Sequence, residues 1–205
     1  MLNSNQLTKV AITGGLSSGK SSACRFFKEL GAYVVSADEI VHTLLSPNTN
    51  LGQDVINLLG PEIIIDYQID RSQIAKKVFE HPDLLHSLER LLHPAVYKEV
   101  EKLYHHANEL KLAPLFIAEI PLLFETGNTS FFDYTIAVLA DPTLCQQRFQ
   151  AATGYGKEEF DKRMARQLSP EEKARRADYV IFNNGNMEAM KNTVQELFKT
   201  LACRN

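Results

Sequence analysis

The sequence predicts an α/β fold, a three-layer sandwich in which helices cover a five-stranded parallel sheet. Short apolar runs typical of strands buried on both faces recur along the chain, at Val10–Thr13, Tyr33–Val35, Leu115–Ile120, Tyr134–Leu139 and Tyr179–Phe182. Between them lie segments with helical periodicity, at Lys20–Leu30, Leu84–Leu92, Ala95–Leu110, Thr143–Ala151 and Met187–Leu201. Alternation of this kind indicates a parallel sheet, because each parallel connection needs a crossover that is usually a helix.

The composition is that of an ordinary globular domain. Of the 205 residues, 44% are hydrophobic and 23% are charged. The net charge of −3 excludes a global basic field, so we expect no nucleic-acid partner. The 3 cysteines lack metal-site or disulfide spacing, and no apolar run reaches the roughly 18 residues that span a membrane. We therefore expect a cytoplasmic protein without a membrane partner, either a monomer or a small homo-oligomer.

Two segments interrupt the alternation of strands and helices. Residues 38–112 are expected to hold no strand, because the short run Ile63–Ile65 lies between a proline and an aspartate; we interpret this segment as a mostly helical insertion on the substrate side. Residues 152–177 are polar, helical and locally basic, and we interpret them as a mobile lid, with a pair of solvated surface helices as the alternative. The core of this single domain is expected to comprise residues 1–37, 113–150 and 178–205.

A phosphate-binding motif lies between the first predicted strand and helix. Residues 14–21, Gly-Gly-Leu-Ser-Ser-Gly-Lys-Ser, fit G-x-x-x-x-G-K-[ST] at every fixed position. The glycines let backbone N–H groups point at an anion, and the start of the helix adds its positive dipole end. Lys20 would bind the β- and γ-phosphates and Ser21 would bind Mg²⁺. The alternative is a chance match, and the motif alone does not separate a kinase from a GTPase or a motor. We expect ATP contacts from Gly14, Gly15, Leu16, Ser17, Ser18, Gly19, Lys20, Ser21 and Ser22.

Two carboxylates follow or end predicted strands. Phosphoryl transfer to a hydroxyl needs a carboxylate that receives the proton. Asp38 comes closely after Tyr33–Val35, at the edge where ligands bind in such sheets, and an N-cap of the next helix is its alternative role. Glu119 lies in an otherwise apolar run, where an unpaired charge is costly. It is a candidate Mg²⁺ ligand together with Ser21, or else a structural salt-bridge partner.

Five further segments follow in order along the chain, and two of them, at 121–125 and 177–185, are far more selective than the phosphate loop. The five are Ser36-Ala37-Asp38, Leu92-His93-Pro94, Pro-Leu-Leu-Phe-Glu at 121–125, Arg-Met-Ala-Arg-Gln at 163–167 and Ala-Asp-Tyr-Val-Ile-Phe-Asn-Asn-Gly at 177–185. With them, the chain resembles the dephospho-CoA kinase family over nearly its whole length. The resemblance implies transfer of the γ-phosphate of ATP to the ribose 3′-hydroxyl of dephospho-CoA, the last step of coenzyme A synthesis.

The resemblance also implies roles for individual residues. Asp38 matches the catalytic base, and Lys20 and Ser21 serve phosphate and Mg²⁺. Positions around the acceptor are matched by His93, Pro94, Pro121, Leu122, Leu123 and Glu125. Three residues of the lid region, Arg148, Arg163 and Gln167, would steady the phosphates of ATP or of the acceptor. The loop at Asn183–Gly185 lies where related kinases hold the adenine of ATP, and ATP contacts are expected from Asn184 and Gly185.

Each of these segments also has a structural explanation. Leu92-His93-Pro94 fits a helix that stops and restarts, residues 121–125 fit an apolar turn, Arg163 fits a surface ion pair, and Asn-Asn-Gly fits a turn. The sequence also departs from the family pattern. Ser17 replaces a glycine, which is tolerated if its φ stays negative; Ser36 replaces an acidic residue, and His42 and Ala152 replace arginines.

Two other functions are alternatives. One is a different small-molecule or nucleotide kinase, in which only the acceptor pocket would differ. The other is a regulatory or motor nucleotidase; the sequence contains neither an N-K-x-D guanine motif nor an L-S-G-G-Q-like run, which argues against this class.

Overall fold

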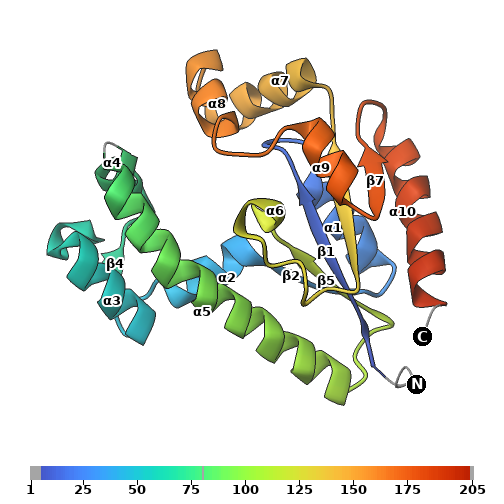
Figure 1. The fold of residues 1–205 in the computed structure, drawn as a ribbon, viewed down its shortest axis with the longest axis horizontal. Coiled ribbons are helices and arrows are strands. Elements are labelled where there is room, and N and C mark those ends of the chain that lie inside the picture. The colour runs from blue at the N-terminus through green and yellow to red at the C-terminus, as the bar shows by residue number, and fades with distance from the viewer. Residues whose placement is uncertain (1–5, 80, 204–205) are drawn as a thin grey trace. The chain divides into compact units, whose positions relative to one another are not determined.

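The computed structural model describes residues 6–79 and 81–203 (Figure 1). These residues form two compact units. One unit is Ala37–Leu103, and the described residues on either side of it form the other. The proposed limits of the insertion and of the lid stay predictions. No helix among the described residues is long and apolar enough to cross a membrane.

The larger unit is built on a five-stranded sheet in the order β2-β5-β1-β6-β7, with every pair parallel. The strands are β1 (Thr8–Gly14), β2 (Tyr33–Ser36), β5 (Leu115–Glu119), β6 (Tyr134–Leu139) and β7 (Tyr179–Phe182). All five predicted strands are confirmed, and so is the α/β fold class. The central strand β1 is buried along nearly its whole length because it has neighbours on both sides, which explains its continuous apolar run.

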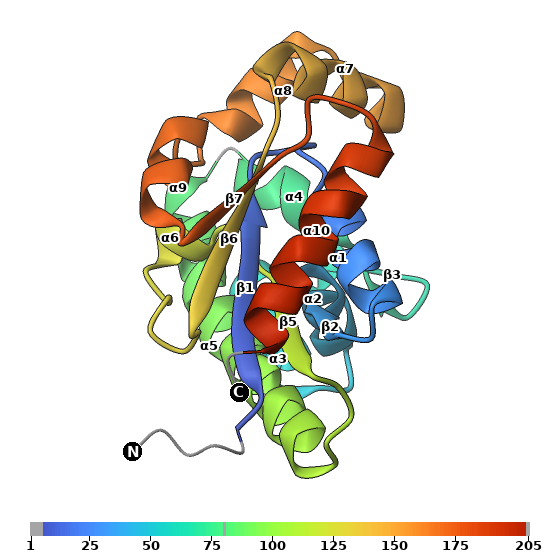
Figure 2. The same ribbon diagram turned by 90° about the vertical axis from the view of Figure 1, so that its right-hand side faces the viewer.

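Helices α1 (Lys20–Glu29) and α10 (Met187–Ala202) lie together over one face of the sheet (Figure 2). Phe27 of α1 and Val194 of α10 are fully buried in one core cluster with Val10 and Ile12 of β1. Elsewhere in this unit, the Tyr104 ring packs edge-on against the Phe116 ring of β5, with ring centroids 5.5 Å apart. Burial of this apolar surface is the main contribution that holds the sheet and its helices together.

The remaining elements of this unit follow β5 and β6. They are α6 (Leu123–Thr126), α7 (Pro142–Thr153), α8 (Lys157–Met164) and α9 (Pro170–Arg176). Side chains cap two of these helices: Asp141 accepts from Thr143 N, and Ser169 accepts from Glu172 N. Helix α8, in the segment interpreted as a lid of polar helices, nevertheless has an apolar anchor. Its Phe160 is buried beside Phe149 of α7, and Leu16 of the phosphate loop packs against the same cluster.

The helical unit contains α2 (Ala37–Leu44), α3 (Asn50–Leu59), the short 3-10 helix η1 (Pro61–Ile63), α4 (Arg71–Phe79) and most of α5 (Pro82–Glu109). The expectation that it holds no strand is wrong, because β3 (Ile64–Ile65) and β4 (Gln68–Ile69) form an antiparallel hairpin. Asp66 and Tyr67 both have positive φ, 48° and 63°, as a two-residue hairpin turn of matching twist requires. Neither is glycine, so the sequence lacks the usual signal for this turn.

Helix α5 corrects a second expectation. Two helices were predicted, Leu84–Leu92 and Ala95–Leu110, but one continuous helix of 28 residues runs through Pro94. Proline removes one backbone hydrogen bond and crowds the preceding turn, at a cost of about 3 kcal/mol. Apolar residues on both sides of Pro94, among them Leu88 and Val100, are buried. Their packing offsets that cost, so the helix continues.

Candidate active site

The phosphate loop connects the end of β1 to the start of α1, and other parts of the chain pack closely against its glycines. A Cβ at Gly14 would lie 2.1 Å from the carbonyl oxygen of Val138, and one at Gly19 would lie 2.2 Å from Asn183 Nδ2. Gly19 also has φ 101°, a conformation that side chains disfavour. Glycine is therefore required at both positions by the space available, as well as by the motif.

Ser17 adopts φ 56°, so the condition stated for tolerating a serine here, a negative φ, is not met. In this left-handed region a residue with a Cβ costs about 1–2 kcal/mol relative to the right-handed one. The loop must turn sharply between β1 and α1, and Ser17 makes that turn where the family usually has glycine. The surrounding packing, including the Leu16 side chain in the lid cluster, holds the loop in this form.

Lys20 and Ser21 begin α1, where the helix dipole favours an anion. The Lys20 ammonium donates to the carbonyl oxygens of Gly15 at 2.9 Å and Gly14 at 3.3 Å. Ser21 Oγ donates to Glu119 Oε1 at 2.9 Å. Glu119 ends β5 and is paired in register with Ile12 of β1, so the sheet brings this carboxylate to the loop.

Ser21 and Glu119 supply a hydroxyl and a carboxylate oxygen, which are ligands that Mg²⁺ accepts. No group of three or more His, Cys, Asp or Glu side chains suited to a metal occurs in the part of the chain that the structure describes. The hydroxyl of Ser21 and the carboxylate of Glu119 fit Mg²⁺, which commonly takes one or two protein ligands and completes its shell with phosphate oxygens and water. Cys24 lies one turn along α1; burial, and then the nearby Glu119 carboxylate, hold the pKa of its thiol well above the usual value.

The segment 121–125 lies directly beside the loop. Thr13 Oγ1 donates to the carbonyl oxygen of Pro121 at 3.0 Å. Glu125 Oε1 accepts from the backbone N–H of Leu168 at 2.8 Å and from the Lys173 ammonium at 2.9 Å. Leu122 is partly exposed, whereas Leu123 is fully buried, so its side chain packs in the interior.

Lys173 was not singled out from the sequence, although its side chain is fully buried. Its ammonium also donates to Pro121 O at 3.0 Å and to Gly14 O at 3.4 Å. Burial lowers the pKa of Lys173, and the Glu125 carboxylate opposes that shift. Lys173 looks like any other charge in a basic helix, and only the fold brings it to the loop.

The loop after β7 reaches the phosphate loop through Asn183, a residue that the sequence placed only in the proposed adenine loop. Asn183 is buried, and its Nδ2 donates to Ser18 O at 2.8 Å. Arg148 Nη2 donates to Asn183 O at 3.1 Å, which brings this predicted ATP contact to the same loop. Asn184 Oδ1 accepts from Asp141 N at 2.7 Å, and Gly185 is exposed beside it.

The two other predicted lid residues lie in different surroundings. Arg163 donates from Nε to Glu159 Oε1 at 2.8 Å, and its guanidinium lies over the rings of Phe149 and Tyr155 at 5.3 and 5.6 Å. Gln167 donates from its backbone N–H to Met164 O, while its buried Oε1 has no hydrogen-bond partner among the described residues. In this conformation Arg163 is thus held against α7 and α8.

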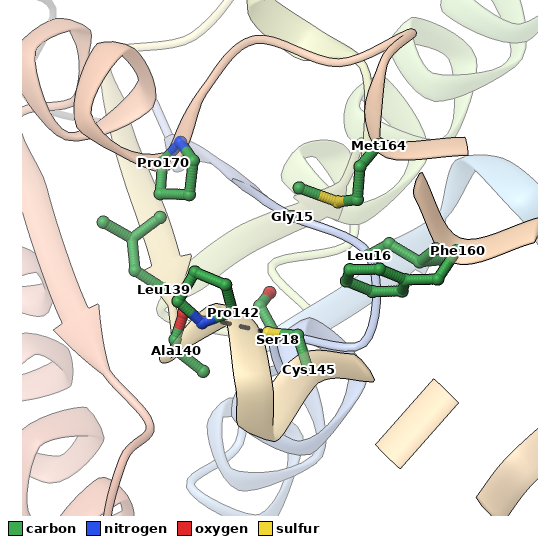
Figure 3. Close-up of a pocket in the computed structure, with 10 residues that line it drawn as sticks. All are labelled: Gly15, Leu16, Ser18, Leu139, Ala140, Pro142, Cys145, Phe160, Met164 and Pro170. Atoms are coloured by element: carbon green, nitrogen blue, oxygen red, sulfur yellow. Dashed lines mark hydrogen bonds between the residues drawn. The ribbon is translucent and has the colours of Figure 1, made fainter. Parts of the chain in front are cut away.

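A small cavity lies between the phosphate loop and helices α7, α8 and α9 (Figure 3). Its volume of about 20 Å³ holds about one water molecule. Ser18 Oγ lies in its wall without a hydrogen-bond partner within the described chain, and Cys145 donates to Ala140 O at 3.8 Å. The other lining residues are Gly15, Leu16, Leu139, Pro142, Phe160, Met164 and Pro170. This space is too small for a nucleotide base.

The family model described as dephospho-CoA kinase matches residues 8–189. The chain belongs to the dephospho-CoA kinase family. It is therefore a kinase, a phosphotransferase that uses ATP. A dephospho-CoA kinase of Protochlamydia amoebophila is 53% identical over 96% of this chain and 97% of that protein. A dephospho-CoA kinase of Chlamydia trachomatis serovar D is 49% identical over 95% of this chain and 96% of that protein.

Solved structures share the fold of this chain. The crystal structure of TT1252 from Thermus thermophilus has a TM-score of 0.79 at 30% identity and covers 96% of this chain and 98% of that one. Dephospho-CoA kinase from Campylobacter jejuni has a TM-score of 0.71 at 23% identity, with the same coverage of both chains, and its likeness is one of fold.

The helical unit contains Asp38, which matches the family's catalytic base, and His93 and Pro94, which match positions around the acceptor. Asp38 is exposed and is the second residue of α2, which begins at Ala37, so Asp38 lies inside the first turn and not at the position that caps it. A carboxylate in this turn also favours the helix dipole. His93 and Pro94 lie within the continuous helix α5, with His93 partly buried and Pro94 exposed.

Proposed function

We propose that this kinase transfers the γ-phosphoryl group of ATP to the ribose 3′-hydroxyl of dephospho-CoA, giving coenzyme A and ADP, the last step of coenzyme A synthesis. The observation that carries the proposal is the Ser21–Glu119 pair beside a complete phosphate loop, at the carboxyl edge of the sheet, in a chain of this family. We expect the protein to act in the cytoplasm, as a monomer or a small homo-oligomer, without a nucleic-acid partner.

The phosphate chain of ATP would lie on the loop. Backbone N–H groups of the loop would point at it, and the N-terminus of α1 would favour its negative charge. Lys20, which now donates to two loop carbonyls, would turn its ammonium to the β- and γ-phosphates. Ser21 and Glu119 would hold Mg²⁺, which neutralises charge on the phosphates when bound. Arg148, Asn184 and Gly185 would contact the remainder of the nucleotide.

In the reaction, the 3′-oxygen of the acceptor attacks the γ-phosphorus. The bond from that phosphorus to the β–γ bridging oxygen breaks, and ADP leaves with the bond's electrons. Asp38 would accept the proton from the 3′-hydroxyl. Acceptor contacts are proposed for His93, Pro94, Pro121, Leu122, Leu123, Glu125, Arg163 and Gln167.

A panel of acceptors in a coupled ADP-release assay tests the proposal. We expect rapid ADP release with dephospho-CoA, little release with shikimate, nucleosides or sugars, and nearly none without an acceptor. Mass spectrometry of the product should show one added phosphate, and a 3′-specific phosphatase should remove it. A higher kcat/KM for another hydroxyl compound would assign a different small-molecule kinase, and rapid hydrolysis without acceptor would assign a nucleotidase.

A further inference from the structure

Lys173 is a lysine buried without solvent contact, and that is unusual for this residue type. It lies on α9, a helix of seven residues whose other charged side chains are exposed or pair with one another at its surface. Two lysines of the neighbouring α8 show the ordinary arrangement: Lys157 and Lys162 are exposed and pair with acids one turn away. Burying an ammonium is costly, so the contacts that Lys173 makes must offset a large desolvation penalty.

The Lys173 ammonium contacts three oxygens from two other segments. They are Glu125 Oε1 at 2.9 Å, Pro121 O at 3.0 Å and Gly14 O at 3.4 Å. Gly14 is the first residue of the phosphate loop, and the other two oxygens belong to the segment that follows β5. Lys173 thus joins the last helix of the proposed lid to the nucleotide side and to the acceptor side of the site.

Further hydrogen bonds complete this arrangement. Glu125 Oε1 also accepts from Leu168 N, just before α9, and Thr13 Oγ1 donates to the same Pro121 carbonyl that Lys173 contacts. The Gly14 carbonyl accepts from Lys20 as well, at 3.3 Å. Two ammonium groups therefore meet at one carbonyl of the loop, and when Lys20 turns to a phosphate, Lys173 is left as the cation that holds this carbonyl.

The orientation of the Gly14 carbonyl matters because a peptide unit is planar. The Gly14 C=O and the Gly15 N–H belong to one peptide unit and point in opposite directions. A group that fixes the carbonyl therefore also aims the N–H, and in a phosphate loop such N–H groups face the anion. Gly14 has φ 153° and no side chain of its own to restrain this unit.

We propose that Lys173 is a positioning residue for phosphoryl transfer, whose ammonium holds the first peptide of the phosphate loop and the segment 121–125 in the geometry that binds the phosphates of ATP. This inference rests on the proposed function, since it assigns a part in the same reaction. Buried ion pairs commonly add little to stability, and burial lowers the pKa of Lys173 despite its partner. The pair is thus better explained by what it positions than by the stability it adds.

The test compares Lys173→Met with Lys173→Arg, which keeps the charge, and with Lys162→Met as the exposed control. For Lys173→Met we expect kcat to fall about 10- to 100-fold, as displacements of about 1 Å can cost that much. Binding of ATP should weaken, whereas binding of adenosine, which has no phosphates, should be unchanged. Lys173→Arg should recover most of the loss, and Lys162→Met should behave as the wild type. General loosening of the fold would weaken both ligands together and would overturn the proposal.

A second comparison guards against misfolding and against an indirect effect through Glu125. Lys173→Met leaves a partly buried carboxylate unpaired, so Lys173→Met/Glu125→Gln is measured against Glu125→Gln alone. We expect a further loss of kcat and of ATP binding in the double variant, because the Gly14 and Pro121 carbonyls lose their cation. No further loss would mean that Lys173 only neutralises Glu125, and the inference would fall. A wild type inactive on dephospho-CoA would instead refute the proposed function, and the ATP–adenosine comparison would still report on Lys173.

Discussion

Ser21 Oγ and Glu119 Oε1 are 2.9 Å apart, and this hydrogen bond links the first turn of α1 to the last residue of β5. The two residues are far apart in sequence, and the parallel pairing of β1 with β5 brings them together. A hydroxyl and a carboxylate at this distance can both turn to one small cation.

Removing either oxygen donor should raise the Mg²⁺ requirement. For Ser21→Ala and Glu119→Gln we expect the Mg²⁺ concentration at half-maximal activity to rise about 10-fold or more, by analogy with altered metal sites. The measurement is the initial rate as a function of Mg²⁺ at fixed ATP. Thr200→Ala, which removes a hydroxyl bonded within α10, serves as the control. An unchanged Mg²⁺ titration in both site variants would rule out this metal site.

Lys20→Ala should abolish transfer and leave the fold intact. Its ammonium is a point charge for the β- and γ-phosphates, and loss of one such group costs about 10²–10³-fold in rate. Lys28→Ala, at an exposed position of the same helix, is the matched control. Circular dichroism and thermal unfolding should match the wild type for both variants, while only Lys20→Ala loses turnover. Near-normal turnover would exclude Lys20 from the reaction.

Asp38→Asn keeps the size of the side chain and removes its charge. We expect turnover to fall by about 10²–10⁴-fold, nearer the lower value if the transition state is loose and the proton leaves late. ATP affinity, measured by calorimetry, should be retained. Glu39→Gln alters the adjacent exposed carboxylate in the same helical turn and should have little effect. Normal turnover in Asp38→Asn would move the base elsewhere, with Glu119 the next candidate.

Gly14→Ala should destabilise the protein much more than Gly31→Ala. Both positions have positive φ, but a Cβ at Gly14 meets a backbone oxygen of β6 at 2.1 Å, whereas one at Gly31 meets nothing within 4 Å. The control therefore measures the conformational cost alone, about 1–2 kcal/mol. Urea unfolding should show an additional loss of about 2 kcal/mol or more for Gly14→Ala. Equal losses would mean that the close approach is readily relieved.

The three cysteines should differ in reactivity. Burial raises the pKa of Cys24 and Cys145, so both remain protonated thiols at pH 8, and the thiolate is the reactive form. Cys203 is exposed. Iodoacetamide treatment of the native protein followed by peptide mass spectrometry should find label at Cys203 and little at the others, while denatured protein should be labelled at all three. Rapid native labelling of Cys24 would show that the α1–β5 contact opens readily.

Local sequence was sufficient to predict the sheet, because each strand is a short apolar run, and β1, β5 and β6 are buried along nearly their whole length. It was insufficient where tertiary contacts override local preference. Helix α5 passes Pro94 because its flanking residues are buried, and the hairpin at 64–69 turns without glycine. The backbone of Ser17 is likewise set by its loop and not by its residue type.

The residues of the candidate site also fall into those that local sequence could predict and those that it could not. The loop residues and Glu119 were found from a motif and from one charge in an apolar run. Lys173 was missed, and Asn183 was predicted only as part of the adenine loop, because their backbone partners, Gly14 O and Ser18 O, are remote in sequence. A lysine in a charged helix and an asparagine in a turn carry no local sign of such contacts.

The order of the strands also has a consequence for how the chain is made. Val10 of β1 pairs with Ile117 and Tyr134, so both partners of the central strand are synthesised after the whole of residues 37–103. At about 5–20 residues per second, the roughly one hundred intervening residues leave the ribosome over about 5–20 s. For that period β1 is an unpaired apolar segment, of the kind that chaperones bind and that aggregates when they are scarce. The helical unit, whose contacts are local, has time to fold first.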